Sequence, residues 1–332
     1  MTFTRMMVAI TATTALFAVP GTAEAGACAW KPTALPLPAG AVQAEASAAD
    51  GLGGYVGTAE FANNEQHVVR WTGSSITDYG RVPGSFPNGL YARDVNRAGV
   101  VVGSATQLVS WVAFRSTGTT LAKLPLPAGA GSSRANAVNE RGDAVGWAVL
   151  PDRTRRALLW PADRPDTVVV LDGLPTGFVE AVDIDDDGTV LVRSSDDQFN
   201  STSYKWRDGV ATALRKPSGA KSTIATGIAA GRVSGTFVYQ DDSRRAGLWD
   251  AAGTPQALPQ GNRAESLNRA GLVVGVIDAG AVPILWRGTT VESVVRTAEQ
   301  LYLGKAGDDG TVAGYYSHSP NNRHSPVVLR CS

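Results

Sequence analysis

Short apolar stretches recur along the chain after residue 26, and clusters of glycine, proline, asparagine and aspartate separate them. Typical stretches are HVVRWTG at 67–73, RALLWPA at 156–162 and ILWRG at 284–288. They are rich in β-branched and aromatic residues, which favour strands, and the 3.6-residue periodicity of an amphipathic helix is not visible. The 37 glycines and 18 prolines supply many turns. The pattern predicts an all-β protein of short strands.

One motif, Ala-x-x-hydrophobic-Asn/Asp-x-x-Gly-x-x-Val-Gly, recurs among these strands. Clear copies are ARDVNRAGVVVG at 92–103, ANAVNERGDAVG at 135–146 and AESLNRAGLVVG at 264–275, and weaker copies lie at 46–57, 181–192, 225–235 and 303–314. The copies follow one another roughly every 43 residues, a period typical of propeller repeats. Asn or Asp followed by Gly predicts a hairpin turn, because glycine readily adopts a positive φ. The turn glycines are Gly53, Gly99, Gly142, Gly188, Gly231, Gly271 and Gly310.

Each repeat unit continues in the same order after the motif. A strand that ends in an aromatic residue is followed by a fourth apolar patch and a Pro-Gly turn, such as LPAG at 126–129 and LPTG at 174–177. Four antiparallel strands per unit, in seven units, predict a seven-bladed β-propeller. A solenoid of helix pairs is the alternative, and it would require the helical periodicity that is absent. The units start near residues 45, 91, 134, 180, 224, 263 and 302.

The heptapeptide LPLPAGA occurs twice, at 35–41 and at 124–130. The second copy ends a complete unit, whereas the first stands near the start of the chain, and the last unit ends at 326–332 without a fourth strand. We therefore expect residues 28–40 to complete the last blade and close the ring. Aligning both ends with a complete unit brings Cys28 and Cys331 to neighbouring positions. The chain has only these two cysteines, and an even count in an exported protein predicts a disulfide between them.

The N-terminus has the features of an export signal. Arg5 precedes the apolar run 6–19, which is too short to cross a bilayer, and AEA at 23–25 offers a cleavage site. We expect residues 1–25 to be removed and residues 26–332 to form one propeller domain outside the cell. The alternative is a lipoprotein in which Cys28 of AGAC carries a lipid. Ala25 stands where a larger aliphatic residue is expected, which disfavours that alternative, and no other segment is apolar enough to span a membrane.

Charge excludes one broad class of partner. Thirty Lys and Arg balance thirty Asp and Glu, so the chain has no net charge. A basic surface of the kind that binds nucleic acid or anionic membranes is therefore not indicated. The mature protein is expected to be an extracellular monomer whose partner is a carbohydrate or a protein.

The repeats resemble those of secreted bacterial HAF-repeat extracellular proteins. The resemblance covers nearly the whole mature chain, the first motif is its sharpest part, and residues 67–71 (HVVRW) are nearest to the block that names the family. The Leu-Gly-Gly ending of the family is replaced here by Leu-Pro-x-Gly. The resemblance implies a secreted propeller of poorly defined activity and supplies no catalytic residues.

The residue before the first Ala of each motif should stand where the inner strands begin, at the mouth of the central channel. These residues form a polar ring that is suited to binding a ligand. The alternative is that a wet channel mouth simply needs polar residues, with charges paired between blades. Apart from the apolar Ile224, the ring consists of Glu45, Tyr91, Arg134, Glu180, Arg263 and Tyr302.

Two further groups of residues are candidates for metal binding. Asp183, Asp185 and Asp187 alternate before Gly188, as in a calcium loop, although Ser194 stands where such a loop needs Glu. A plain solvated turn is the alternative. His318 and His324 lie in the polar segment SHSPNNRHS, which is predicted to be an exposed loop. No cofactor other than calcium is indicated.

Three functional classes remain open. The first is a non-catalytic secreted binding scaffold, for a glycan or a component of the cell envelope, because propellers form rigid platforms and fold alone does not set function. The second is a polysaccharide hydrolase or lyase with its site at the channel mouth. The third is a calcium-dependent adhesion module. No nucleophile elbow, zinc-protease helix or phosphate loop is present to identify an enzyme.

Overall fold

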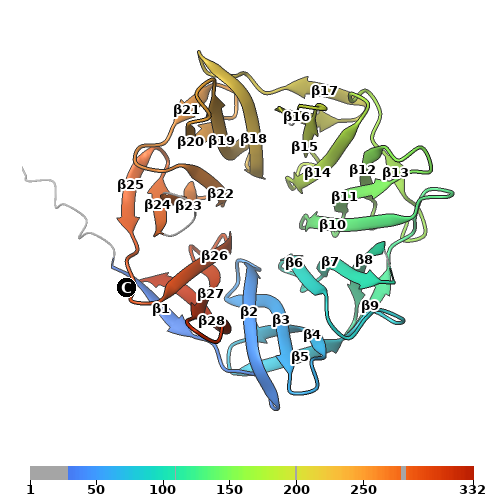
Figure 1. Ribbon diagram of the computed structural model, residues 1–332, viewed down its shortest axis with the longest axis vertical. Coiled ribbons are helices and arrows are strands. Elements are labelled where there is room, and N and C mark those ends of the chain that lie inside the picture. Colours follow the sequence, from blue (N-terminus) through green and yellow to red (C-terminus); the bar gives the residue numbers. More distant parts are fainter. Residues whose placement is uncertain (1–28, 109, 199, 278–281) are drawn as a thin grey trace, which may run out of the picture.

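The chain is an all-β propeller in which sheets of antiparallel strands are arranged around a central axis (Figure 1). The computed structural model describes residues 29–332 except 109, 199 and 278–281. Every regular element in these ranges is a β-strand. No helix that is long and apolar enough to cross a membrane is found in them. The all-β prediction is therefore confirmed.

Five sheets have four strands each in the described part of the chain. In four of them the strand order follows the chain order, and the first strand lies nearest the axis (Figure 1). These sheets are β2 (Ala41–Ala49), β3 (Gly54–Phe61), β4 (Gln66–Thr72) and β5 (Ser75–Gly80); β6 (Leu90–Val95), β7 (Val101–Gln107), β8 (Ser110–Thr117) and β9 (Thr120–Lys123); β18 (Ala220–Ala229), β19 (Arg232–Tyr239), β20 (Arg244–Trp249) and β21 (Pro255–Ala257); and β22 (Arg263–Leu267), β23 (Leu272–Ile277), β24 (Val282–Arg287) and β25 (Thr290–Val294).

The fifth sheet combines the two ends of the chain. Its order is β1-β28-β27-β26, so β1 (Trp30–Ala34) lies beside β28 (Arg323–Cys331), followed by β27 (Val312–His318) and the inner strand β26 (Gln300–Ala306). The pairing of β1 with β28 is antiparallel, and Trp30 lies opposite Cys331. Cys28 lies outside the described residues.

The other eight strands form one sheet, which differs from the prediction of seven separate blades. Its members are β10 (Ser132–Val138), β11 (Ala144–Val149), β12 (Arg155–Trp160) and β13 (Val169–Val170), then β14 (Phe178–Ile184), β15 (Val190–Ser195), β16 (Ser201–Arg207) and β17 (Val210–Ala213). A single parallel bridge, Arg155 to Phe178, connects the two groups. The bridge forms because β13 has only two residues and leaves the start of β12 free to accept a second neighbour.

The repeat motif forms the inner hairpin of every unit. All seven turn glycines have positive φ, for example +86° at Gly142. Each inner strand has a register shift just after the first Ala of the motif, such as that between Ala135 and Ala137. The later motif glycine is needed at this point: a Cβ at Gly146 would lie 1.9 Å from the carbonyl oxygen of Arg134. The motif therefore specifies a β-bulge whose residues face the axis.

Tryptophans of the third strands connect neighbouring sheets. Trp71 and Trp160 are buried, and their indole nitrogens donate hydrogen bonds of 2.7 Å to the carbonyls of Pro36 and Pro125. Pro36 and Pro125 are the same position in the two LPLPAGA copies. The first copy therefore makes the contact that the second makes in a continuous unit. Trp206, Trp249 and Trp286 make equivalent bonds to Asp172, Arg215 and Pro259.

Candidate functional site

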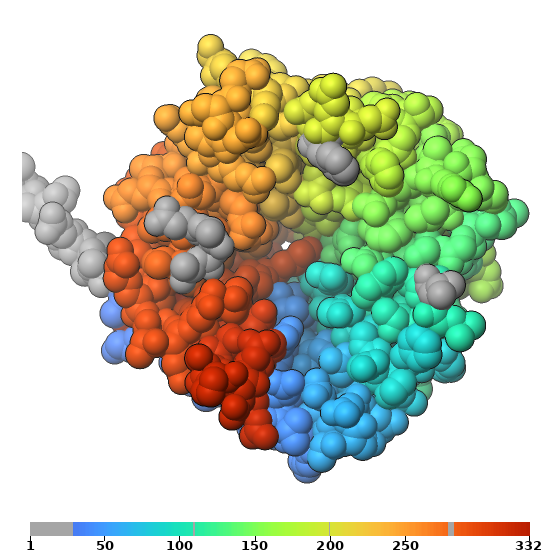
Figure 2. All heavy atoms as spheres, in the orientation of Figure 1, coloured from blue at the N-terminus to red at the C-terminus, as the bar shows by residue number. Residues whose placement is uncertain are grey.

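The predicted ring residues largely gather at one cavity, which we call the open mouth. Five of the six line a cavity of about 510 Å³ where the inner strands begin, and the centre of the ring is hollow in Figure 2. Arg263 does not line the cavity. It forms an ion pair of 2.9 Å with Glu265, and Glu265 does line the cavity. The structure thus brings the five together, and their role in binding stays a prediction. The five are Glu45, Tyr91, Arg134, Glu180 and Tyr302.

Sequence reasoning missed a second set of lining residues, which lie opposite the first across the hairpin. Arg134 is paired with Trp147, Glu180 with Arg193, and Tyr302 with Tyr315. The signal was present, because each partner is the residue after the final position of the motif. The bulge residues were missed too, and they follow the first Ala of the motif: Ser47, Arg93, Asn136, Val182 and Glu265.

The carboxylates of the open mouth are already paired. Both oxygens of Glu180 are engaged, one by Arg155 at 3.2 Å and the other by Arg193. Glu45 contacts the ring Nδ1 of His324 at 2.5 Å. Burial and then the charge of Glu45 raise the pKa of the nearby Tyr315 to about 12, so this phenol stays protonated at neutral pH.

Arg134 of the open mouth and the nearby Arg155 are packed against aromatic rings. The Arg134 guanidinium lies 3.6 Å from the ring centroid of Trp111, and that of Arg155 lies 4.2 Å from the centroid of Trp147. Such cation–π contacts hold guanidinium planes in place without neutralising them. Burial, followed by the positive charges of Arg93 and Arg155, lowers the pKa of Arg134. This side of the mouth is therefore a preorganised cluster of positive charge.

Two tyrosines expose their rings at the same mouth. Tyr91 is 41% exposed and Tyr302 is 37% exposed. Tyr302 stacks on Tyr315 with 5.1 Å between centroids and 20° between planes, and Tyr91 packs against Trp111. Stacking on Tyr315 holds the ring of Tyr302 in one orientation. The other face of the Tyr302 ring is therefore available to a ligand.

A partly buried lysine forms the floor of the open mouth. Lys305 of β26 donates hydrogen bonds of 2.9 Å to Asp94 of β6 and to Asp183 of β14. The side chains of the two aspartates are only 10% and 13% exposed. Burial alone would lower the pKa of Lys305, but the charges of Asp183 and Asp94 and their hydrogen bonds raise it. Burial and the charge of Asp183 raise the pKa of Asp94, although Lys305 opposes this.

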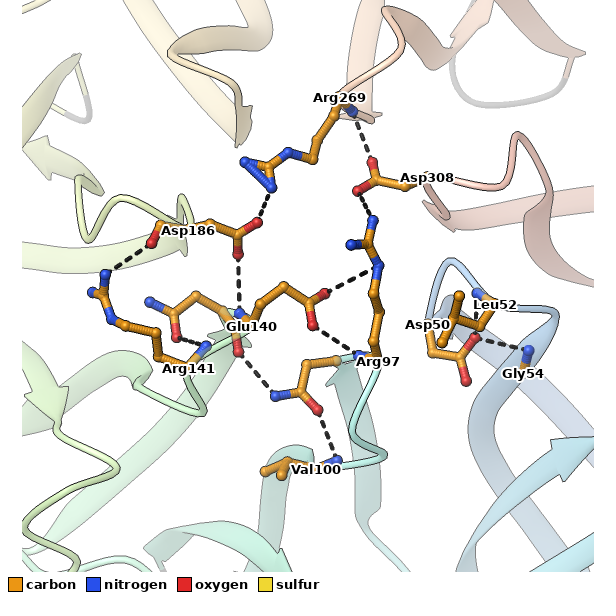
Figure 3. Close-up of polar contacts among 12 residues, drawn as sticks. Asp50, Leu52, Gly54, Arg97, Val100, Glu140, Arg141, Asp186, Arg269 and Asp308 are labelled. Atoms are coloured by element: carbon orange, nitrogen blue, oxygen red, sulfur yellow. Dashed lines mark hydrogen bonds and ion pairs between the residues drawn. The ribbon is translucent and has the colours of Figure 1, made fainter.

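The opposite end of the channel, which we call the closed end, is narrowed to a cavity of about 110 Å³ by charges that pair with one another. Figure 3 shows Arg97 between Glu140 and Asp308, with Asp308 Oδ2 at 2.8 Å. Arg269 pairs with Asp186 across the axis. Carboxylates also accept backbone N–H groups from the neighbouring unit: Asp186 from Glu140 at 2.9 Å and Asp308 from Arg269 at 2.9 Å.

The Asn or Asp side chains of the repeat motif also connect neighbouring units at the closed end. Asn96 donates its amide to the carbonyl of Asn139 at 3.0 Å, and Asn268 donates to that of Gly307 at 2.7 Å. Asp185 instead accepts from the N–H groups of Ala230 and Gly231. The motif Asn or Asp thus stabilises the ring as well as its own hairpin turn.

The three predicted calcium ligands each have a different protein partner. Asp183 binds Lys305, Asp185 accepts the N–H groups just described, and Asp187 pairs with Arg207 at 2.6 Å. Within the described ranges, no group of three acidic, histidine or cysteine side chains is placed to hold a metal ion. The structure therefore does not bring these aspartates to a common point.

The two histidines of the segment SHSPNNRHS lie on strands rather than in a loop. His318 ends β27 and contacts Glu299 at 2.7 Å, whereas His324 is near the start of β28. The two strands form a hairpin, and the prediction of an exposed loop was wrong for these two positions. His324 belongs to the open mouth through Glu45, and its neighbour across this contact is Tyr315, 4.7 Å away between ring centroids.

Comparison with known proteins identifies the fold and not the activity. No family model and no curated protein matches the chain. Among solved structures, it is similar to a puromycin hydrolase (14% identity, TM-score 0.61, covering 87% of this chain and 53% of that one). It is also similar to an oligogalacturonate lyase from Vibrio parahaemolyticus (9%, 0.58, 86% and 90%). A third is YCF48 bound to D1 peptide (14%, 0.52, 91% and 94%).

The chain spans about half the length of the peptidases that it resembles, for example 50% of a prolyl endopeptidase at 12% identity and a TM-score of 0.57. Identities this low show a shared fold alone. The chain is a β-propeller with four-stranded antiparallel blades, and its function has to be inferred from its own residues.

Proposed function

We propose that the protein is a non-catalytic extracellular binding propeller whose ligand occupies the open mouth. The observation that carries the proposal is the cavity of about 510 Å³, which is lined by inner-strand residues and has Lys305 as its floor. A cavity of this size with aromatic walls and a few converging polar groups is the usual form of a small-ligand site. Lys305, which pairs with Asp94 and Asp183, would block the channel below the ligand and so keep it at the open mouth.

The proposed ligand class is an extracellular glycan or another component of the cell envelope. The exposed faces of Tyr91 and Tyr302 support this class, because flat aromatic rings pack well against the apolar faces of sugar rings. Hydroxyl groups of a sugar would find donors and acceptors in the lining residues Ser47, Thr58 and Asn136.

The pairing of the carboxylates favours binding over hydrolysis. A glycosidase needs one carboxyl group free to give a proton and a second free to act as a base or nucleophile. Both oxygens of Glu180 are held by arginines, and Glu45 contacts the ring of His324, so neither carboxylate is without a partner. A hydrolase or lyase and a calcium-dependent adhesion module remain the weaker proposals for the same chain.

We also propose that the ring has seven blades and is closed by β1. Treating β10–β13 and β14–β17 as two blades supports this count, because a single bridge connects them. The pairing of β1 with β28 and the hydrogen bond from Trp71 to Pro36 support the closure. An export signal at 1–25 and a disulfide between Cys28 and Cys331 belong to the same proposal. Replacing Cys331 with Ser should then lower stability by about 2–4 kcal/mol, seen as a lower Tm without reductant.

A glycan array probed with the mature chain, followed by calorimetry, tests the binding function. We expect at least one extracellular glycan to bind and to raise Tm, and Tyr302→Ala to weaken this binding at least tenfold. Tyr239→Ala, on β19, is the matched control and should bind as the parent does. A folded protein that binds no glycan and no envelope component, or binding that is unaffected by Tyr302→Ala, would contradict the proposal.

A further inference from the structure

Two of the arginines that line the open mouth form no ion pair. Each carboxylate there has a side-chain partner: Glu180 pairs with Arg155 and Arg193, Glu265 pairs with Arg263, and Glu45 contacts the ring of His324. Lys305 is paired with two acids, Asp94 and Asp183, so it is not free to bind an anion. Among the described residues, Arg93 and Arg134 line the cavity with no ion pair, because their contacts are to the rings of Tyr91, Trp111 and Trp147.

The two arginines are adjacent in space as well as in the repeat. Arg93 is the bulge residue of β6, and Arg134 precedes the bulge of the next inner strand, β10. Their like charges repel, and this repulsion contributes to the lowered pKa of Arg134. The buried Nε of Arg134 has no hydrogen-bond acceptor. Two like charges and an unsatisfied donor in one wall cost free energy in the unliganded protein, and an anion would recover it.

We infer that the ligand of the open mouth is an acidic sugar, whose carboxylate binds between Arg93 and Arg134 while its ring packs on an exposed tyrosine. The inference rests on the proposed glycan-binding function and specifies its substrate class. A guanidinium offers two parallel N–H donors that match a carboxylate, and weak hydration makes it easy to desolvate. Tyr91 contacts Arg93 through a cation–π contact of 5.5 Å, so the apolar platform and the anion site are side by side.

Calorimetry with charged and uncharged forms of the same sugars tests this inference. The probes are trisaccharides of glucuronic, galacturonic and mannuronic acid, the methyl ester of each, and pentaglutamate as an acidic peptide. We expect at least one acid trimer to bind at least tenfold more tightly than its ester. Arg134→Gln and Arg93→Gln should each remove most of that difference, because binding of the acid weakens much more than binding of its ester.

Arg97→Gln is the matched control, because it removes an arginine from the other end of the same channel with the same change in net charge. It should retain the preference for the acid. Equal binding of acid and ester, or a preference that survives both arginine substitutions, overturns the inference and leaves the glycan-binding function standing. Pentaglutamate binding as tightly as the trimers would overturn the sugar assignment. A lack of binding to every glycan, charged or neutral, would instead contradict the proposed function itself.

Discussion

The two ends of the channel are built from the same repeat, yet their charges are arranged in opposite ways. At the closed end, Arg97 and Arg269 face Glu140, Asp186 and Asp308, and carboxylates also accept backbone N–H groups. At the open mouth, Arg93 and Arg134 pack against aromatic rings, and neither forms an ion pair with an acid of the described residues. A charge whose partners lie within the protein is already engaged, whereas a charge without an ion pair is available to a ligand.

The difference matters because both sets of residues are polar and lie close to the axis. Counting polar residues at a channel mouth would not separate them. The interaction partners of these residues do separate the two ends. At the closed end the charged side chains form ion pairs between units, whereas at the open mouth one wall keeps arginines without an ion pair. The following substitutions test this contrast, from the largest expected effect to the smallest.

Lys305→Met should cause the largest loss, because it leaves Asp94 and Asp183 buried together without a cation. Removing one member of a buried charge cluster typically costs about 3–5 kcal/mol. Urea unfolding at pH 7 measures the loss. The triple variant Lys305→Met, Asp94→Asn, Asp183→Asn removes all three charges and should recover most of it. A loss below about 1 kcal/mol for Lys305→Met would show that the floor is not held by this cluster.

Asn96→Ala should cause the next largest loss at the closed end. The buried side chain donates to the carbonyl of Asn139 and accepts the N–H of Val100 at 2.9 Å, and alanine leaves both groups unpaired. We expect a loss of about 2 kcal/mol. Asn136→Ala is the comparison at the open mouth; it removes a single, partly buried bond to the carbonyl of Ala181 and should cost less. Equal losses would remove the distinction between the two ends.

Arginine substitutions should change stability in different ways at the two ends. Arg97→Gln should lower stability by up to about 1 kcal/mol in low salt and by less in high salt, because its ion pairs are partly exposed. Arg134→Gln should leave Tm unchanged or raise it, since it relieves repulsion from Arg93. Thermal unfolding of both variants in low and high salt gives the comparison. A marked loss for Arg134→Gln would mean that this arginine is structural.

Glu140→Gln should have the smallest effect, and its sign depends on pH. Burial raises the pKa of Glu140. A backbone hydrogen bond from Arg97 and the charge of Arg97 lower it, whereas the charges of Asp186 and Asp308 raise it further. A raised pKa means that folding disfavours the ionised carboxylate. Glu140 therefore lowers the stability of the fold at pH 7, and this loss disappears as the pH falls to the pKa of an ordinary glutamate. The variant should therefore equal or slightly exceed the parent at pH 7, with the difference vanishing near pH 4.

Asp143→Asn is the control of opposite sign. Burial would raise the pKa of Asp143, but hydrogen bonds from Ala162, Asn139 and Arg141 outweigh it and lower the pKa. Its contribution to stability is present above its ordinary pKa and is lost as the pH falls. The variant should be less stable than the parent at pH 7, by an amount that shrinks toward pH 3. Unfolding curves from pH 3 to 7 that show the same trend for both variants would contradict this assignment.

The repeat predicted the local structure well because short-range geometry determines it. Positive φ at Gly142 follows from the hairpin turn, and Trp160 is buried because the third strand of every unit faces its neighbour. The open mouth was predicted in part for the same reason: the residue before the motif Ala begins an inner strand in each unit.

Contacts across the axis could not be predicted in the same way. Lys305 lies in one of the weaker copies of the motif, and its partners Asp94 and Asp183 belong to distant units. Which repeat positions meet at the centre depends on the bulge and on the diameter of the ring, and neither is visible in one unit. The bridge from Arg155 to Phe178 escaped prediction because it depends on how early the two-residue β13 ends.

The hydrogen bond from Trp71 to Pro36 sets a lower limit on how the protein can be shortened. A fragment that begins at residue 40 would lack β1, so β28 would lose its outer neighbour. It would also leave the buried indole of Trp71 in the next sheet without an acceptor. A fusion or truncation boundary placed after the first LPLPAGA would therefore damage the first and last sheets of the ring at once, although it removes only one short strand.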